Sequence, residues 1–126
     1  AISFDAAWGA DDTDTLLDIL KQNNVKATFF MCGYWVDKYP EEVKKIASAG
    51  HDLGNHSATH PHMNSLSSEQ IKKEIQDTHQ KVLNLTGYEM ELFRPPFGEY
   101  NNTVIQTASE CGYHTIQWDV DSLNMV

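Results

Sequence analysis

The sequence predicts an α/β fold built from parallel strands and crossover helices. Short apolar runs alternate along the chain with amphipathic stretches, and this alternation indicates a βαβαβαβαβ order. Chemically active side chains also follow the apolar runs, as expected where sites form at the carboxyl ends of parallel strands. Five such strands fit either a doubly wound sheet or part of a (β/α) barrel, and periodicity does not choose between them.

Five apolar runs have the length and composition of buried strands. The second of them, ATFFM, is rich in aromatic residues, which strands favour. The fourth is halted by Pro95-Pro96, because proline restricts the residue before it and lacks a backbone N–H. The expected strands are Ala1–Asp5, Ala27–Met31, His51–Gly54, Glu91–Arg94 and Tyr113–Trp118.

Four amphipathic stretches predict helices between these strands. Pro40 fits the first turn of the second helix and Gly50 fits its end. Ser67, with Gln70 three residues later, predicts a capping box at the start of the third. The expected helices cover Thr13–Asn23, the stretch from Pro40 to Gly50, the stretch from the Ser67 cap to Thr86-Gly87, and Asn102–Gly112.

Length and composition fit one domain. The chain has 126 residues, of which 40% are hydrophobic, so a packed core is expected. The formal net charge of −9 makes nucleic acid and anionic membrane surfaces poor partners and favours a neutral substrate or a cation. No apolar run reaches the roughly 20 residues of a membrane span. Cys32 and Cys111 form no disulfide framework, and we expect both to be buried as small apolar side chains.

His56-Ser57-Ala58-Thr59-His60 places two imidazoles four residues apart. Four residues is about one helical turn, so both rings could face one point. Neutral imidazole is the commonest metal ligand, and a carboxylate or water could complete a divalent site. The pair alone also fits a His-rich surface loop, since His62 lies close by.

Two other segments carry candidate catalytic groups. Asp5 ends the first strand, where a carboxylate serves either as a helix cap or as a general base beside the histidines. Arg94 precedes the stiff Pro95-Pro96 pair and could hold a carboxylate in a bidentate pair, although a rigid turn with a surface arginine is the alternative interpretation. The backbone N–H of Phe97 could point at a reacting oxygen.

The last expected strand ends in Trp118-Asp119-Val120-Asp121. An aromatic face stacks on sugar rings, although a core tryptophan is the alternative interpretation of Trp118. The remaining histidines, His51, His79 and His114, are interpreted as structural or exposed.

Taken together, these segments resemble the polysaccharide deacetylases of carbohydrate esterase family 4, the NodB homology domain. The motifs occur in the family's order along the whole chain, which is more specific than any single match. Ser3-Phe4-Asp5 resembles the opening T-F-D-D motif, His56–His60 matches H-[ST]-x-x-H, Arg94–Gly98 matches R-P-P-[YF]-G, and Trp118–Leu123 matches the segment leading into the D-W motif.

The resemblance implies a distorted (β/α) barrel, usually of seven strands, of which this chain would supply about five. Residues 1–126 are then one NodB-like domain, which we expect to be truncated at both ends. The implied reaction is hydrolysis of acetyl groups from N-acetylglucosamine units of peptidoglycan or a chitin-like polysaccharide. The resemblance also implies a carbohydrate partner and a location at the bacterial cell surface, in the wall or secreted.

The resemblance assigns roles to single residues. His56, His60 and Asp5 bind a divalent metal, with zinc or cobalt expected. Asp5 is also the base that activates a water on the metal, and Arg94 orients it. The metal and the N–H of Phe97 stabilise the oxyanion. The implied substrate-binding residues are Pro95, Pro96, Trp118 and Asp121.

The chain departs from the family pattern at three places. Ala6 stands where the family has a second aspartate, normally a metal ligand. Asp5, Asp11, Asp12 or water could fill the gap, and weaker metal binding is expected than with both aspartates. The D-W motif reads Asn124-Met125, and the closing L-x-x-H motif would lie beyond Val126.

These departures keep alternative functions open. The chain could be a non-catalytic relative that binds glycan or metal, or an esterase that removes O-acetyl groups from xylan. A metal-free hydrolase of small cyclic amides is a further alternative, and the two histidines argue against it.

Overall fold

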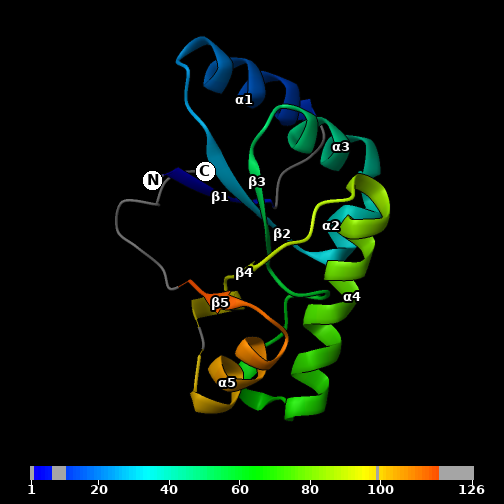
Figure 1. Cartoon of the computed structure of the whole chain (residues 1–126), viewed down its shortest axis with the longest axis vertical. Coiled ribbons are helices and arrows are strands. Elements are labelled where there is room, and N and C mark those ends of the chain that lie inside the picture. Colours follow the sequence, from blue (N-terminus) through cyan, green and yellow to red (C-terminus); the bar gives the residue numbers. More distant parts are fainter. Residues whose placement is uncertain (1, 7–10, 99, 117–126) are drawn as a thin grey trace.

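The computed structural model describes residues 2–6, 11–98 and 100–116, and it confirms the α/β prediction (Figure 1). The strands are β1 (Ile2–Ala6), β2 (Ala27–Met31), β3 (Asp52–Asn55), β4 (Leu92–Phe93) and β5 (His114–Thr115). The helices are α1 (Asp11–Gln22), α2 (Gly33–Lys38), α3 (Pro40–Ser48), α4 (Ser68–Thr86) and α5 (Asn102–Glu110), with 3-10 turns η1 (Met63–Ser65) and η2 (Pro96–Gly98).

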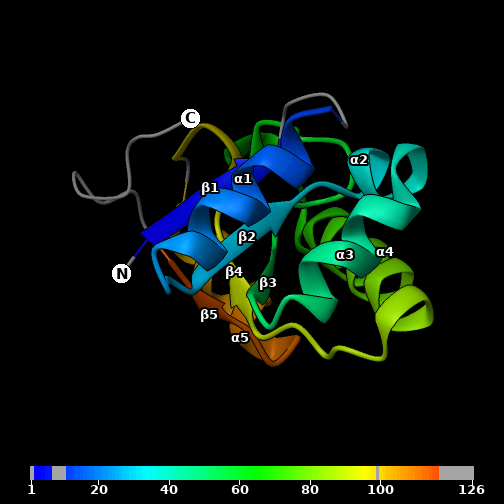
Figure 2. The same cartoon turned by 90° about the horizontal axis from the view of Figure 1, so that it is seen from above.

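The strands form one parallel sheet whose spatial order follows the chain, β1-β2-β3-β4-β5. A doubly wound sheet reverses direction at a switch point, whereas this order never does. It is the winding of a (β/α) barrel, with right-handed crossovers that leave the helices on the outside. Figure 2 shows the strands following one another around a curve, with α2, α3 and α4 gathered on one side.

One helix of the structure was not predicted. The stretch before Pro40 forms the short helix α2, whose first residue Gly33 follows a Cys32 side chain that makes no capping hydrogen bond. Tyr39 separates α2 from α3 with φ −129° and ψ 60°. Proline disfavours helical geometry in the residue before it, so Pro40 both begins α3 and keeps the two helices apart.

The predicted ends of the longest helix are confirmed. The Ser67 hydroxyl accepts from the Gln70 N–H at 3.3 Å, and Gln70 Oε1 accepts from the Ser67 N–H at 2.9 Å. Gly87 ends α4 with φ 76°, a left-handed conformation that glycine adopts without steric cost. The apolar face of α4 packs against the sheet through the buried side chains of Ile71, Ile75 and Val82. The predicted capping box therefore fixes where this face begins.

The core lies between the sheet and its outer helices. Its fully buried side chains come from β2, β3, β4, the turn η1 and the inward faces of α2, α3, α4 and α5: Phe29, Met31, Val36, Val43, Ile46, Leu53, Met63, Ile71, Ile75, Val82, Phe93, Val104 and Ala108. Cys32 is buried and Cys111 half-buried, both as free thiols. Burial raises the pKa of the Cys32 thiol to about 12, so the thiol stays protonated and donates to the His56 carbonyl at 3.2 Å.

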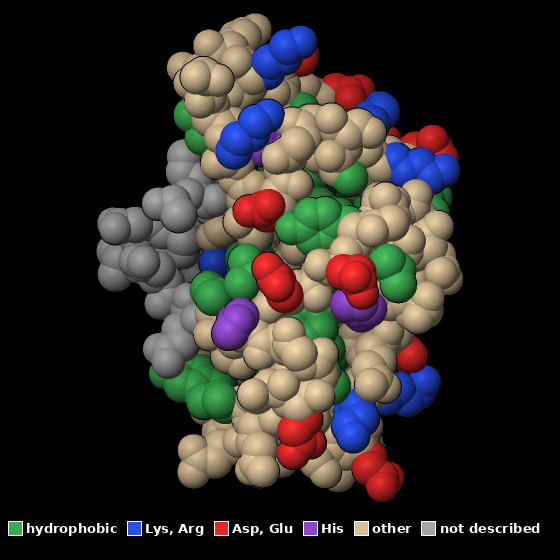
Figure 3. All heavy atoms as spheres, in the orientation of Figure 1, with side chains coloured by type: hydrophobic (Ala, Val, Ile, Leu, Met, Phe, Trp, Pro, Cys, Tyr) green, Lys and Arg blue, Asp and Glu red, His purple; other side chains and the backbone are tan. Residues whose placement is uncertain are grey.

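The described helices include no membrane span, and the face drawn in Figure 3 carries no basic patch. None of the described helices is long and apolar enough to cross a bilayer. On that face acidic and basic side chains lie interspersed (Figure 3).

His51 is structural, as predicted. It is buried, and its Nδ1 accepts a hydrogen bond from the Ala27 N–H at 3.1 Å, which holds the start of β2 beside β3. An accepting Nδ1 requires an unprotonated nitrogen, and burial lowers the pKa of His51 below its ordinary value of 6.5. The native state therefore favours the neutral ring.

We predict that acid destabilises the fold through His51. Below about pH 6.5 His51 of the unfolded chain binds a proton, while the native ring stays neutral because its pKa is lower. The free energy of unfolding therefore decreases as the pH is lowered from about 6.5 to the native pKa of His51. Urea unfolding between pH 8 and pH 5 measures this. His51→Gln, which keeps an acceptor and cannot titrate, should flatten the fall, whereas His114→Gln at an exposed position should not. An unchanged slope in His51→Gln would contradict the assignment.

Candidate active site

Arg94, which directly follows β4, is hydrogen-bonded to the edge strand β1. Its Nη1 donates to Asp5 Oδ1 at 2.7 Å and its Nη2 donates to Ser3 Oγ at 2.7 Å. Ser3 and Asp5 lie two residues apart on β1 and therefore project from the same face of the strand. The predicted pairing of Arg94 with a carboxylate is present, but it is not bidentate. One Nη group donates to Asp5 and the other donates to Ser3.

This contact depends on the curvature of the sheet. Arg94 follows β4, and β4 is three strands from β1. Strands spaced about 4.8 Å apart would separate the two by about 14 Å in a flat sheet. The guanidinium is 2% exposed and lies over the Phe30 ring of β2, with 4.1 Å between its Cζ and the ring centroid. Gly54 of β3 makes room for that ring, since a Cβ there would lie 2.4 Å from Phe30 Cδ1.

The backbone of Arg94 positions His56. The Arg94 N–H donates to the Asn55 carbonyl at 3.0 Å, and the Arg94 carbonyl lies 2.7 Å from His56 Nδ1. A carbonyl can only accept, so Nδ1 carries the proton and Nε2 keeps its lone pair. Burial lowers the pKa of His56, which favours this neutral form.

The free lone pair of His56 faces the carboxylate of Asp5. His56 Nε2 lies 3.8 Å from Asp5 Oδ2, which is the oxygen that Arg94 Nη1 leaves open. The ring of His60 lies edge-on to the His56 ring, with 4.8 Å between centroids. The structure thus places His56 beside Asp5 on one side and beside His60 on the other, after the carboxyl ends of β1 and β3.

The segment between the two histidines is a loop, so the helical explanation of their spacing was wrong. Ser57 and His60 have φ of 73° and 60°, left-handed values that few non-glycine residues adopt. Asn55, which is fully buried, accepts from the Ser57 N–H at 2.9 Å and donates to the Ile75 carbonyl at 2.8 Å. The Ser57 hydroxyl accepts from the His60 N–H at 3.1 Å. These bonds bring the imidazoles together without a helical turn.

Phe97 extends the site toward solvent. It has φ 59° and a side chain that is 56% exposed. Its ring stacks on His62 with 4.0 Å between centroids and meets the edge of His60 at 4.7 Å. Pro95 and Pro96 are buried beneath this turn. Their role in binding substrate and the role of the Phe97 N–H stay predictions, while Trp118, Asp119 and Asp121 lie outside the described residues.

The donors at this site suit a divalent metal in kind. Two imidazoles and a carboxylate are the ligand types that zinc prefers, and Nε2 of His56 faces Oδ2 of Asp5 with both atoms able only to accept. Such a pair of acceptors favours a cation or a proton between them. Within residues 2–6, 11–98 and 100–116, however, no group of three or more His, Cys, Asp or Glu side chains converges as metal ligands. The predicted set of Asp5, His56 and His60 therefore stays a prediction.

Two supporting residues escaped the sequence analysis. Asn55 and Glu74 both hold the loop that carries the histidines, Asn55 from the end of β3 and Glu74 from α4. Asn55 stands next to the motif histidine, and a polar residue ending an apolar strand was a signal that could have identified it. In the sequence Glu74 looks like an ordinary polar residue on the surface of a helix, so no local pattern indicates its contact with the loop.

Comparison with known proteins assigns the family. A sequence profile described as polysaccharide deacetylase matches residues 1–116. The chain belongs to the polysaccharide deacetylase family. It is 37% identical over 124 residues to a peptidoglycan-N-acetylglucosamine deacetylase of Bacillus cereus, covering 98% of this chain and 45% of that relative. This polysaccharide deacetylase domain thus spans less than half the length of that curated relative.

Solved structures of the family share the fold. A carbohydrate esterase of family 4 from Streptomyces lividans, in complex with acetate, matches with a TM-score of 0.89 and 37% identity over 95% of this chain and 62% of that one. A family 4 pseudoenzyme from Bacillus anthracis matches with a TM-score of 0.90 and 36% identity, covering 94% of this chain and 42% of that chain. The NodB fold predicted from the motifs is therefore confirmed.

We predict that Arg94→Ala lowers the free energy of unfolding by about 3 kcal/mol, because removing one partner of a buried pair leaves the other charge uncompensated. Asp5 is 19% exposed and would lose its partner at 2.7 Å. Urea unfolding measures the change. Lys44→Ala, which breaks an exposed pair with Glu41 at 3.5 Å, is the control and should have little effect. Equal losses in the two variants would contradict the importance of the Arg94 contact.

Proposed function

We propose that this domain hydrolyses acetyl groups from N-acetylglucosamine units of peptidoglycan with the help of a divalent metal. The observation that carries the proposal is the position of His56, which lies 3.8 Å from Asp5 Oδ2 and packs against the ring of His60. The Bacillus cereus relative, named a peptidoglycan-N-acetylglucosamine deacetylase, supports the choice of substrate. Such a substrate would place the protein at the bacterial cell wall.

Asp5 is the general base in this proposal. Arg94 holds Oδ1, so Oδ2 is the oxygen left to accept a proton from the attacking water. The water oxygen bonds to the acetyl carbon as one of its protons passes to Asp5. When the C–N bond breaks, the leaving nitrogen takes that proton back, and the products are acetate and a free amine. The N–H of Phe97 stabilises the negative oxygen that develops on the acetyl group.

His56 and His60 are the residues that would hold the metal, with zinc or cobalt proposed. When bound there, the metal supplies Lewis-acid chemistry that polarises the acetyl carbonyl and lowers the pKa of water. His56 is prepared for this role because the Arg94 carbonyl fixes its proton on Nδ1. The exposed ring of Phe97, stacked on His62, offers an apolar surface beside the histidines for a sugar ring.

A second candidate function is glycan or metal binding without turnover. It is favoured by Ala6, which ends β1 directly after Asp5 and has no side-chain donor for a metal. The Bacillus anthracis relative, named a pseudoenzyme, shows that the family fold occurs in a protein so described. The two candidates differ in whether acetate is released, and this difference decides between them.

Acetate release from N-acetylglucosamine oligomers and from peptidoglycan tests the main proposal. With added zinc or cobalt we expect release that a chelator abolishes and that Asp5→Asn lowers at least about 100-fold, the usual contribution of a general base. Asp18→Asn, an exposed carboxylate of α1, is the matched control and should keep full activity. Metal binding without any acetate release would favour the binding function instead.

Zinc titration by calorimetry tests the ligands separately from turnover. We expect the double variant His56→Ala and His60→Ala to lose zinc binding, because it removes both imidazoles of the pair. Ala6→Asp should tighten binding by about tenfold or more, since it adds a carboxylate next to Asp5 at the end of β1. If the double variant binds zinc as tightly as the parent chain, the proposed site is wrong.

A further inference from the structure

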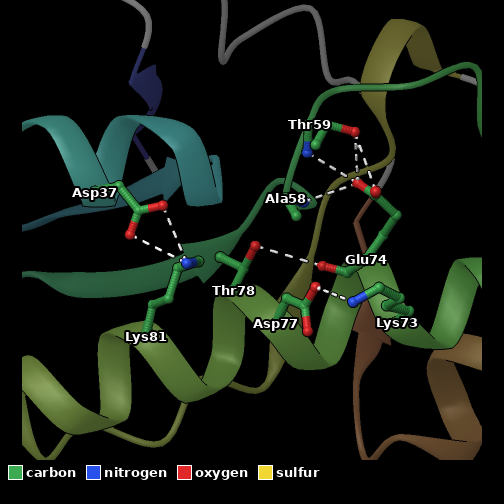
Figure 4. Close-up of polar contacts among 8 residues, drawn as sticks. All are labelled: Asp37, Ala58, Thr59, Lys73, Glu74, Asp77, Thr78 and Lys81. Atoms are coloured by element: carbon green, nitrogen blue, oxygen red, sulfur yellow. Dashed lines mark hydrogen bonds and ion pairs between the residues drawn. The ribbon is translucent and has the colours of Figure 1, made fainter.

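Glu74 of α4 directs its carboxylate at the loop between the two histidines (Figure 4). Its Oε1 accepts from the N–H groups of Ala58 and Thr59 at 3.0 and 2.9 Å. The Thr59 hydroxyl lies 3.1 Å from Oε1 and 3.0 Å from Oε2. Glu74 is half-buried and makes no ion pair within the described part of the chain, so this loop supplies the protein donors that its carboxylate contacts there.

The same loop is held from its other side by α2. The Gly33 N–H donates to the Ser57 carbonyl at 2.9 Å, and the Tyr34 N–H donates to the Ala58 carbonyl at 3.0 Å. The close approach requires glycine at position 33, since a Cβ there would lie 2.9 Å from Thr78 Oγ1 and 3.1 Å from the Ala58 Cα. Carbonyl groups of the loop thus meet α2, while its amides meet Glu74 on α4.

The loop needs such support because its backbone is strained. Ser57 and His60 both adopt left-handed φ values, which cost non-glycine residues of order 1 kcal/mol each. A conformation of this kind persists only where the surroundings determine it. Hydrogen bonds to an ionised carboxylate are roughly twice as strong as neutral ones, so Glu74 provides the strongest acceptor that the loop amides contact.

We propose that Glu74 is a positioning residue that locks the His56–His60 loop and keeps the two imidazoles side by side before any metal binds. This inference rests on the proposed function for the metal, while the locking of the loop stands on the geometry alone. Lys73 and Asp77 form an exposed ion pair 3.0 Å apart on the same helix and do not contact the loop (Figure 4). Asp77 is therefore a surface carboxylate, whereas the carboxylate of Glu74 is hydrogen-bonded to the loop backbone.

Three variants of Glu74 distinguish the effects of the hydrogen-bond acceptor, the length of the side chain and its negative charge. Glu74→Ala removes the acceptor while raising helix propensity, so any loss does not come from a weakened α4. Glu74→Asp keeps the charge and withdraws the carboxylate by one methylene. Glu74→Gln keeps an oxygen at the same reach. Asp77→Ala is the control on the same helix, since it breaks only the exposed pair with Lys73.

Two measurements on the full chain read out the effect. Amide hydrogen exchange at Ala58 and Thr59, followed by NMR without metal, reports the lock itself. Calorimetric titration with zinc reports its consequence at the histidines. We expect Glu74→Ala and Glu74→Asp to raise exchange at both amides at least about tenfold and to weaken zinc binding about 10- to 100-fold, the range for supporting groups of metal ligands.

Glu74→Gln should recover most of both properties, to within about fivefold of the parent, and Asp77→Ala should match the parent. Parent-like exchange at Ala58 and Thr59 in Glu74→Ala and Glu74→Asp overturns the proposal. If Glu74→Ala fails to fold, the contrast between Glu74→Asp and Glu74→Gln decides it. If the parent binds no zinc, the proposed metal function fails, and the exchange rates still decide whether Glu74 locks the loop.

Discussion

The contact of Arg94 with β1 is the interaction on which the rest of the site depends. It joins the fourth strand of the sheet to the first, and it can form only because the sheet curves. The guanidinium lies inside that curve over Phe30, where water competes little for its hydrogen bonds. A buried charge is costly unless it is paired, so the buried guanidinium of Arg94 is stable only with its partners Asp5 and Ser3 in place. In turn, Arg94 fixes the positions of these two side chains.

Backbone strain is concentrated where the chemistry is proposed. Four non-glycine residues among those described have positive φ, and three of them belong to the site: His60 itself, Ser57 in the loop before it, and Phe97 beside its ring. Left-handed conformations at these positions aim the rings of His60 and Phe97 at one another across two separate loops. A regular helix or strand would satisfy its own backbone but would not place these groups together. The supporting bonds from Asn55, Glu74 and α2 follow from that requirement.

Periodicity and motif residues predicted the succession of strands and helices along the chain, the capping box and the pair His56 and His60, because each of these depends on local sequence. Other features arise from tertiary contacts and could not be predicted in the same way. The choice of barrel over open sheet depends on which strands pair, and the role of Glu74 depends on a loop 15 residues away. The spacing of His56 and His60 correctly predicted that their rings lie side by side, but the assumed helical turn was wrong. A loop with left-handed residues brings the two rings together instead.

A single residue sets both the proposed base and the proposed ligand. The side chain of Arg94 fixes one oxygen of Asp5, while its carbonyl fixes the tautomer of His56. Neither effect involves the residue at position 6, so the orientation of these two groups is independent of the aspartate that the family motif has there. The exchange of that aspartate for Ala6 should therefore act on how tightly a metal is retained, while the base and the first imidazole keep their places. Activity would then be limited by occupancy of the site more than by its geometry.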